Sequence, residues 1–375
     1  MMGTSYSIDT ITSQDELSLL ESDWNRLSES ATAPNVFTTF GWFWAWTRRR
    51  VGEVGRGRFE PHVLLLKRND AVVGIAPLIR RRFSRFGFSV RKLEFVTNHA
   101  DYNDLVLGDD AADQVDPLIE FLSQTRTEWD LIDLRDLRGT GNAIARIERA
   151  LASAGLRYRL FGETERCPYL SIDGDAASLM KRLSGHTRRT LRRRMEQAVS
   201  DGLSMRIIQN PWQEPSLLKK LIALDHQKHL RSLNPPFVGT YPEVFQYLFD
   251  ELGPRGWLYV ALLEKGDHPV AFQLGFRCGG KLWDYTKAYD RSFCRFAPGS
   301  MLLTALLDYG FEQGYYEYDF LRGEEQYKKV WSTGFHPRFR LLIWNRRWMS
   351  RLCVLVYSNS RVRAAYARIK ENFSA

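Results

Sequence analysis

The sequence predicts an α/β fold of the α+β kind, built from two tandem domains that each hold a mixed, mostly antiparallel sheet flanked by helices. The chain has 375 residues, of which 44% are hydrophobic, so it is long enough for two well-packed domains. The same order of elements occurs twice, as a hairpin, further strands, a helix and a closing Arg-Gly pair. We therefore predict domains over residues 1–165 and 166–345, followed by a basic helical tail over 346–375.

In the first half, alternating apolar residues predict strands on both sides of the turn at Asn69-Asp70. A polar loop, residues 98–104, follows the third strand of this half, and the half closes at Arg138-Gly139. The expected strands lie over 62–67, 72–79, 92–96 and 129–134, with a helix over 118–124.

The second half repeats the pattern around a turn at Gly266-Asp267 and closes at Arg322-Gly323. A helix is expected from Pro298, because a proline and a glycine there are followed by apolar residues at three-to-four spacing. The expected strands lie over 257–263, 270–276, 281–289, 315–320 and 339–344.

Between the halves, residues 179–199 form a predicted helix with one apolar face and many arginines. Five of the seven residues from 188 to 194 are arginines, which is more than solubility requires. A solvated face is one interpretation, but we favour contact with a phosphate-bearing ligand through Arg188 and Arg192.

The helix that begins at Pro298-Gly299-Ser300 predicts an anion site. A helix start offers free N–H groups and a positive dipole, glycine allows close approach, and Arg295 lies just upstream. A plain helix start is the alternative. The first half has no such motif but has Asp109, Asp110 and Asp113 at the matching place, so only the second half is expected to hold an anionic cofactor.

Polar residues gather after the strand that ends at Asp319. We expect Asp319 to accept the proton of an attacking amine and Tyr327 to donate one to a leaving group, with Arg322 and Lys328 binding anionic parts of the substrates. The alternative is an ion pair that braces the turn. Acceptor contacts are expected in the polar loop of the first half, at His99, Asp101, Tyr102 and Asp104.

Charge and composition limit the partners. The net charge of +9 favours an acidic partner, such as a phosphorylated cofactor, a nucleic acid or an anionic membrane. The four cysteines and the histidines show no metal-ligand spacing, so no metal is expected. No apolar run reaches 18 residues and the start has no signal-peptide pattern, which predicts a cytoplasmic protein. The basic tail would allow peripheral contact with the inner face of the membrane.

The chain resembles the GNAT superfamily of N-acyltransferases. It looks most like the branch of CelD-like acetyltransferases of cellulose and polysaccharide biosynthesis, and its two-domain build is similar to that of the Fem peptidyltransferases. The residues that carry the resemblance are 288–290 (AYD), 298–300 (PGS), 319–323 (DFLRG) and 327–328 (YK).

The resemblance implies two GNAT-like domains, of which the first is degenerate and the second binds acetyl-CoA or another acyl-CoA. The pyrophosphate would lie at Pro298-Gly299-Ser300, although this segment keeps only one glycine and the arginine of the common GNAT phosphate loop. The implied function is acyl transfer to an amine of a sugar or other small metabolite, in polysaccharide or cell-envelope biosynthesis. The alternatives are a Fem-like transferase that uses aminoacyl-tRNA and a non-enzymatic basic module that binds membrane or nucleic acid. The oligomeric state stays open.

Overall fold

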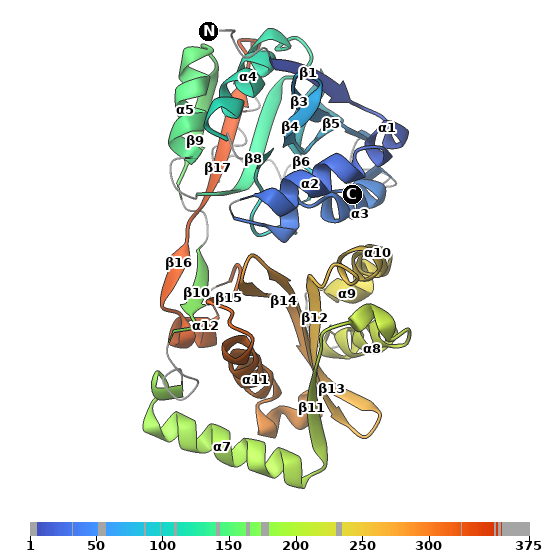
Figure 1. Cartoon of the computed structure of the whole chain (residues 1–375), viewed down its shortest axis with the longest axis vertical. Coiled ribbons are helices and arrows are strands. Elements are labelled where there is room, and N and C mark those ends of the chain that lie inside the picture. The colour runs from blue at the N-terminus through green and yellow to red at the C-terminus, as the bar shows by residue number, and fades with distance from the viewer. Residues whose placement is uncertain are drawn as a thin grey trace, which may run out of the picture. The chain divides into compact units, whose positions relative to one another are not determined.

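The computed structural model divides into two compact units, which do not coincide with the two halves of the sequence. It describes residues 6–31, 33–51, 58–85, 88–97, 99–108, 111–139, 143–162, 166–173, 180–229, 235–323, 325–348, 350, 351 and 354. Unit 1 is Met1–Thr164 together with Pro337–Ala375, and unit 2 is Glu165–His336 (Figure 1). Most of the predicted tail lies outside the described residues.

Unit 1 contains a four-stranded sheet in the order β1-β3-β4-β7 and a six-stranded sheet in the order β2-β5-β6-β8-β17-β9. The strands are β1 (Tyr6–Ile11), β2 (Arg58–Pro61), β3 (Val63–Arg68), β4 (Ala71–Ala76), β5 (Leu78–Arg85), β6 (Phe88–Phe95), β7 (Val106–Leu107), β8 (Leu131–Arg138), β9 (Arg157–Phe161) and β17 (Arg338–Trp344). The helices are α1 (Gln14–Ser18), α2 (Glu21–Ser30), η1 (Val36–Thr38), α3 (Phe40–Val51), α4 (Ala111–Gln124) and α5 (Ala143–Ser153).

The predicted hairpin of the first half is confirmed as β3 and β4. Asn69 and Asp70 both have positive φ, at 50° and 63°, as a two-residue hairpin turn requires. The helices α4 and α5 pack on the sheets with apolar residues such as Leu118, Ile119 and Leu151, which builds the core of this unit.

Strand β17 is an inner strand of the six-stranded sheet of unit 1, although the sequence-based boundary at 345 would place it in the second domain. It lies between β8 and β9 and pairs antiparallel with both. Its Leu341 and Ile343 enter the core of unit 1, and Arg340 binds the buried Asp133 carboxylate at 2.7 Å. The apolar pattern of this strand shows that it is buried but cannot show which sheet receives it.

Unit 2 has one seven-stranded sheet in the order β11-β12-β13-β14-β15-β10-β16. The strands are β10 (Cys167–Ser171), β11 (Leu203–Ile208), β12 (Leu258–Lys265), β13 (His268–Cys278), β14 (Lys281–Tyr289), β15 (Glu317–Asp319) and β16 (Gly334–His336). The helices are α7 (Gly185–Ser200), η2 (Pro211–Gln213), α8 (Leu217–His229), α9 (Phe237–Thr240), α10 (Pro242–Leu252), η3 (Arg291–Phe296), α11 (Pro298–Glu312) and α12 (Gln326–Trp331).

The sheet of unit 2 has a different set of helices on each face. α7 and α11 share an apolar core with Leu282 and Tyr318 of the sheet, whereas α8 packs on β13 and β14 outside that core. In Figure 1, α11 and the helices α8–α10 accordingly lie on opposite sides of the strands β12–β14.

Both units contain one parallel pair within an otherwise antiparallel meander. β6 pairs parallel with β8 in unit 1, and β14 pairs parallel with β15 in unit 2. This shared arrangement agrees with the repeat predicted from the sequence. None of the helices in the described part of the chain is both long and apolar enough to cross a bilayer.

Candidate functional site

The two strands of the parallel pair in unit 2 separate after three residues. β14 and β15 are paired only from Lys281 with Glu317 to Trp283 with Asp319. β15 then ends, and the Phe320 N–H donates to the Pro168 carbonyl on β10. Residues 284–289 of β14 therefore have no strand partner on this side among the described residues. Tyr285, Thr286 and Lys287 on this edge are partly exposed, so a ligand can reach it.

Unit 1 differs at the corresponding place. The polar loop of this unit inserts beside β8, because Asn103 forms a parallel bridge with Leu137 and its N–H donates to the Asp136 carbonyl at 2.8 Å. The open edge seen in unit 2 is thus partly filled in unit 1. The expectation that only the second copy holds a cofactor stays a prediction.

A bulge in β14 places a carboxylate beside the free edge. The register shifts between Leu274 and Gly275 of β13, so that Asp284 and Thr286 pair with consecutive residues and Tyr285 is extra. Bulges redirect side chains in this way and are common next to active sites. Gly275 permits the arrangement, because a Cβ there would lie 2.2 Å from the Trp283 carbonyl oxygen and 2.4 Å from the Tyr259 hydroxyl.

Asp284, Lys287 and Tyr327 form a polar cluster at this edge. The Lys287 ammonium donates to the Asp284 carboxylate at 2.5 Å and to the Tyr327 phenol oxygen at 2.6 Å. The Tyr327 hydroxyl in turn lies 3.5 Å from Asp284. Burial, and then the negative charge of Asp284, raise the pKa of the Tyr327 phenol well above its ordinary value. Tyr327 therefore stays protonated at neutral pH, and the Lys287 ammonium is placed to stabilise the phenolate that proton donation would leave.

Three buried polar side chains, those of Gln273, Tyr318 and Tyr259, lie near Asp284 of the cluster. The Gln273 amide donates to the Tyr318 hydroxyl, and the Tyr259 hydroxyl donates to the Trp283 carbonyl at 3.3 Å. Burial, followed by the charge of Asp284, raises the pKa of both tyrosines, so both remain neutral. Within the described part of the chain, the buried Gln273 amide oxygen has no hydrogen-bond partner, so these side chains form a polar region inside an apolar core.

Asp319 is separated from Tyr327 by the sheet. Its neighbour Tyr318 faces the core shared with α11, so the alternation of a strand places Asp319 on the opposite face. It is 1% exposed and accepts the Leu321 N–H at 2.8 Å. Asp319 was expected to act with Tyr327, and the structure does not bring the two together. Its role as a base stays a prediction.

Three potential metal ligands meet on the Asp319 face. Oxygen or nitrogen atoms of Glu317, Asp319 and His336 lie within 4.8 Å of one another. The Lys281 ammonium already binds Glu317 at 2.6 Å, and His336 binds Glu317 at 2.8 Å. Burial disfavours the Glu317 carboxylate, but these two partners outweigh it and lower the pKa of Glu317. Lys281 thus supplies the positive charge that a metal would bring.

Lys328 and Arg322 form part of the turn after β15. Lys328 is buried, its ammonium donates to the Arg322 carbonyl, and it pairs with Glu325 at 3.1 Å. The alternative was an ion pair of Asp319 with Arg322 or Lys328, whereas the carboxylate that pairs with Lys328 here is that of Glu325. A role in binding anionic groups stays a prediction for both residues.

The start of α11 is accessible from solvent. Ala297 has a left-handed backbone with φ 54° and leads into Pro298, the first residue of the helix. A Cβ at Gly299 would meet no atom within 4 Å, and Ser300 is exposed. The Ser300 N–H is already bonded to the Ala297 carbonyl at 2.9 Å, whereas the Gly299 N–H has no partner within the described residues. The motif therefore offers fewer free donors than a regular helix start.

The predicted basic residues lie along the helix next to this start. α7 packs against η3 and α11, and Arg295 of η3 pairs with Asp201 at the end of α7. Arg192 on α7 is exposed and pairs with Glu196 at 3.0 Å, and Arg188 is partly exposed. Arg295 thus lies at the C-terminal end of α7, whereas Arg188 lies near the N-terminal end of this helix and Arg192 near its middle.

The predicted acceptor loop is largely packed inside unit 1. Tyr102 is fully buried under Arg138, and its carbonyl accepts the Asn35 amide at 2.9 Å. Asp101 is buried, and His99 stacks on Trp46 with ring centroids 4.7 Å apart. Burial raises the pKa of Asp104 to about 6. Acceptor binding by these four residues stays a prediction.

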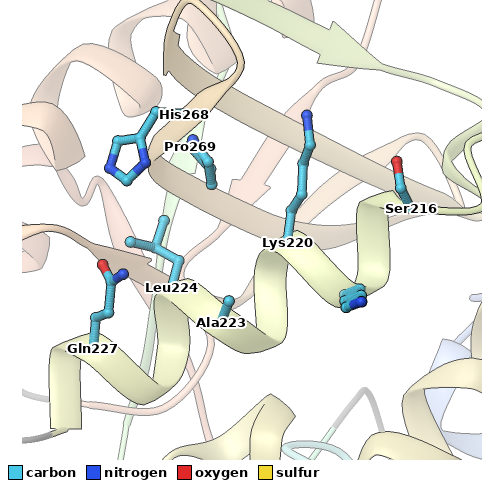
Figure 2. A pocket seen from close by; sticks show the side chains of 8 residues that line it. Ser216, Lys220, Ala223, Leu224, Gln227, His268 and Pro269 are labelled. Atoms are coloured by element: carbon cyan, nitrogen blue, oxygen red, sulfur yellow. The ribbon is translucent and has the colours of Figure 1, made fainter.

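A hollow of about 290 Å³ lies on the α8 side of unit 2 (Figure 2). It lies between α8 and the start of β13, and its residues are Ser216, Lys219, Lys220, Ala223, Leu224, Gln227, His268 and Pro269. This is the face of the sheet opposite to α11, so the hollow takes no part in the Asp284–Lys287–Tyr327 cluster.

Comparison with known proteins supports a transferase domain in unit 2. Residues 185–329 match the model of the family described as Acetyltransferase (GNAT) domain. No curated protein matches the sequence. The matched segment contains Asp284, Lys287, Tyr327 and the start of α11.

Solved structures share the fold over nearly the whole chain. FemX superposes with a TM-score of 0.60 and 11% identity, covering 89% of this chain and 96% of that chain. The C-terminal domain (DUF2156) of a putative lysylphosphatidylglycerol synthetase from Agrobacterium fabrum superposes with a TM-score of 0.54 and 13% identity. The match covers 90% of this chain and 95% of that chain. A conserved protein of unknown function from Bacteroides thetaiotaomicron superposes with a TM-score of 0.54 and 11% identity. The match covers 91% of this chain and 100% of that chain. At these identities the likeness shows the fold alone.

Proposed function

We propose that the chain is an acyl-CoA-dependent N-acyltransferase that transfers an acyl group, such as acetyl, to an amine of a sugar or another small metabolite. The observation that carries the proposal is the Asp284–Lys287–Tyr327 cluster beside the free edge of β14. The match of this segment to the Acetyltransferase (GNAT) domain supports the reaction class.

The free edge and the start of α11 suit the two ends of the donor. The arm of coenzyme A contains amide groups, and an extended arm can pair with unpaired backbone groups at a sheet edge. Its diphosphate suits the Gly299 N–H at the positive end of α11, where a ligand can approach the backbone closely. Arg295 lies two residues before Ala297, but it pairs with Asp201, so a diphosphate would have to compete with this carboxylate for its guanidinium group.

Acyl transfer forms a carbon–nitrogen bond and breaks a carbon–sulfur bond. The amine loses a proton and the leaving thiolate gains one. We assign the donated proton to Tyr327, which is neutral at physiological pH and is held by Lys287. We assign the amine proton to Asp284, because this carboxylate lies on the Tyr327 side of the sheet. Asp319 is the competing candidate, on the opposite face.

The proposed acceptor follows from the resemblance to the CelD-like branch. A sugar amine in polysaccharide or cell-envelope biosynthesis is the acceptor that the CelD-like resemblance implies. The alternative, in which aminoacyl-tRNA is the donor, is what the resemblance to the Fem peptidyltransferases implies, and FemX shares the fold over most of both chains. A cytoplasmic location is part of the proposal.

Ligand binding by the purified full chain distinguishes the two donors. We expect coenzyme A and acetyl-CoA to raise the melting temperature, since a ligand that binds only the folded state stabilises it. Coenzyme A lacking its diphosphate should have little effect. A melting temperature unchanged by coenzyme A, together with salt-sensitive binding of aminoacyl-tRNA, would transfer the proposal to the alternative.

A further inference from the structure

Helix α7 is fixed to unit 2 by one face and presents arginines on the other. Leu191 and Ala198 are buried in the core that α7 shares with α11. At 100° per residue, Arg188, Arg189, Arg192 and Arg193 fall within an arc of about 140° that lies outside this buried face. Equivalent arginines on successive turns are about 6 Å apart along the axis. We call these four residues the arginine face.

Few acidic groups neutralise the arginine face. The sequence from Lys181 to Met195 contains no Asp or Glu. Among the described residues, the ion pair that involves this face is the one between Arg192 and Glu196, and the Arg192 side chain is still 84% exposed in it. Figure 1 shows α7 along the edge of unit 2, beyond α11. The face is therefore a fixed, open array of positive charge.

We propose that the arginine face binds the surface of an anionic lipid bilayer. A bilayer surface attracts clusters of basic residues without needing a shaped pocket. Val199 is 69% exposed and its helical angle lies between those of Arg188 and Arg192, so an apolar side chain accompanies the charges. Binding of single-stranded nucleic acid uses aromatic side chains for stacking, and α7 has no Phe, Tyr or Trp. The observations thus favour lipid over nucleic acid.

Co-sedimentation of the full chain with lipid vesicles tests the proposal. We expect binding to phosphatidylcholine vesicles that contain phosphatidylglycerol, and no binding to phosphatidylcholine alone. Changing the four arginines of the face to Gln should weaken binding by about 100-fold or more, since each basic residue near the surface contributes roughly a factor of five. A matched control removes the same charge from exposed arginines of unit 1, Arg48, Arg126, Arg149 and Arg157, and should bind nearly as well.

A second variant separates charge from folding and from specific recognition. Changing the arginine face to Lys keeps the charge but not the planar guanidinium groups, so binding to the bilayer should persist. The proposal is overturned if the wild-type chain does not bind anionic vesicles, if the Gln variant and the control bind equally, or if the Lys variant loses binding. RNA binding that depends on this face, without vesicle binding, would also overturn it in favour of nucleic acid.

Discussion

The phenol oxygen of Tyr327 lies 2.6 Å from the ammonium nitrogen of Lys287. The two residues are 40 positions apart in the sequence, and the separation of β14 from β15 allows α12 to bring its tyrosine to the edge of β14. Because the same ammonium binds Asp284, the cluster joins a neutral hydroxyl, a cation and a carboxylate in one place. These are the groups that the proposed proton transfers require.

Changing Tyr327 to Phe should lower kcat by about 10²- to 10⁴-fold, because general acid catalysis contributes that much. The ring stays, so the melting temperature and the affinity for coenzyme A should change little. Turnover with acetyl-CoA and a panel of amines measures the effect. Tyr289→Phe, at the exposed end of β14, is the control and should stay active. Normal turnover by Tyr327→Phe would remove it from the mechanism.

The two candidate bases can be separated by Asp284→Asn and Asp319→Asn, which change charge but not size. We expect Asp284→Asn to reduce kcat with a smaller change in the KM for acyl-CoA. Asp319→Asn should keep most activity, since Asp319 lies on the other face of β15. The opposite ranking, with activity lost only in Asp319→Asn, would restore the assignment made from the sequence.

The sequence predicted the elements of the site better than their grouping. The hairpin at Asn69-Asp70, the helix at Pro298 and the strand ending at Asp319 all occur, because turn residues and apolar periodicity are local signals. Asp284 and Lys287 were missed as site residues. The available signal was the pair of charged residues inside a strand that is otherwise largely apolar or aromatic, but the bulge that redirects them depends on Gly275 of the neighbouring strand.

Gly299→Glu should weaken the binding of coenzyme A without destabilising the fold. A carboxylate near a helix start interacts favourably with the dipole, and a side chain at Gly299 meets no atom within 4 Å of its Cβ. The same charge would repel a diphosphate. Calorimetric titration with coenzyme A measures the loss, and Gly299→Ala is the control for size. Equal affinity in Gly299→Glu and wild type would place the diphosphate elsewhere.

Asp104→Asn should stabilise unit 1 near neutral pH. Burial raises the pKa of Asp104 to about 6 in the folded state, against 3.8 ordinarily. The protonated form is therefore favoured by folding, so stability is fully present below pH 3.8 and is lost as the pH rises through 6. Asparagine stays neutral and avoids this loss, which amounts to about 2–3 kcal/mol at most. Denaturant unfolding at pH 4 and pH 7.5 tests it: the advantage of Asn should be large only at the higher pH.

Arg340→Met should destabilise unit 1, although residue 340 follows all of unit 2 in the sequence. Arg340 on β17 binds the Asp133 carboxylate at 2.7 Å, with Lys92 at 3.3 Å on the same carboxylate. Burial disfavours the charged form of Asp133, but Lys92, Arg340 and Arg135 outweigh this and hold its pKa well below the ordinary value. Removing one partner of a buried ion pair costs about 3 kcal/mol.

Hydrogen exchange locates this loss. Exchange in β8 and β9 should accelerate in Arg340→Met, while exchange in β12 and β13 of unit 2 stays as in the wild type. Arg192→Gln is the control, because it removes an exposed ion pair worth less than about 1 kcal/mol. Faster exchange in β12 and β13 before β8 would mean that β17 stabilises unit 2, as the boundary at residue 345 implied.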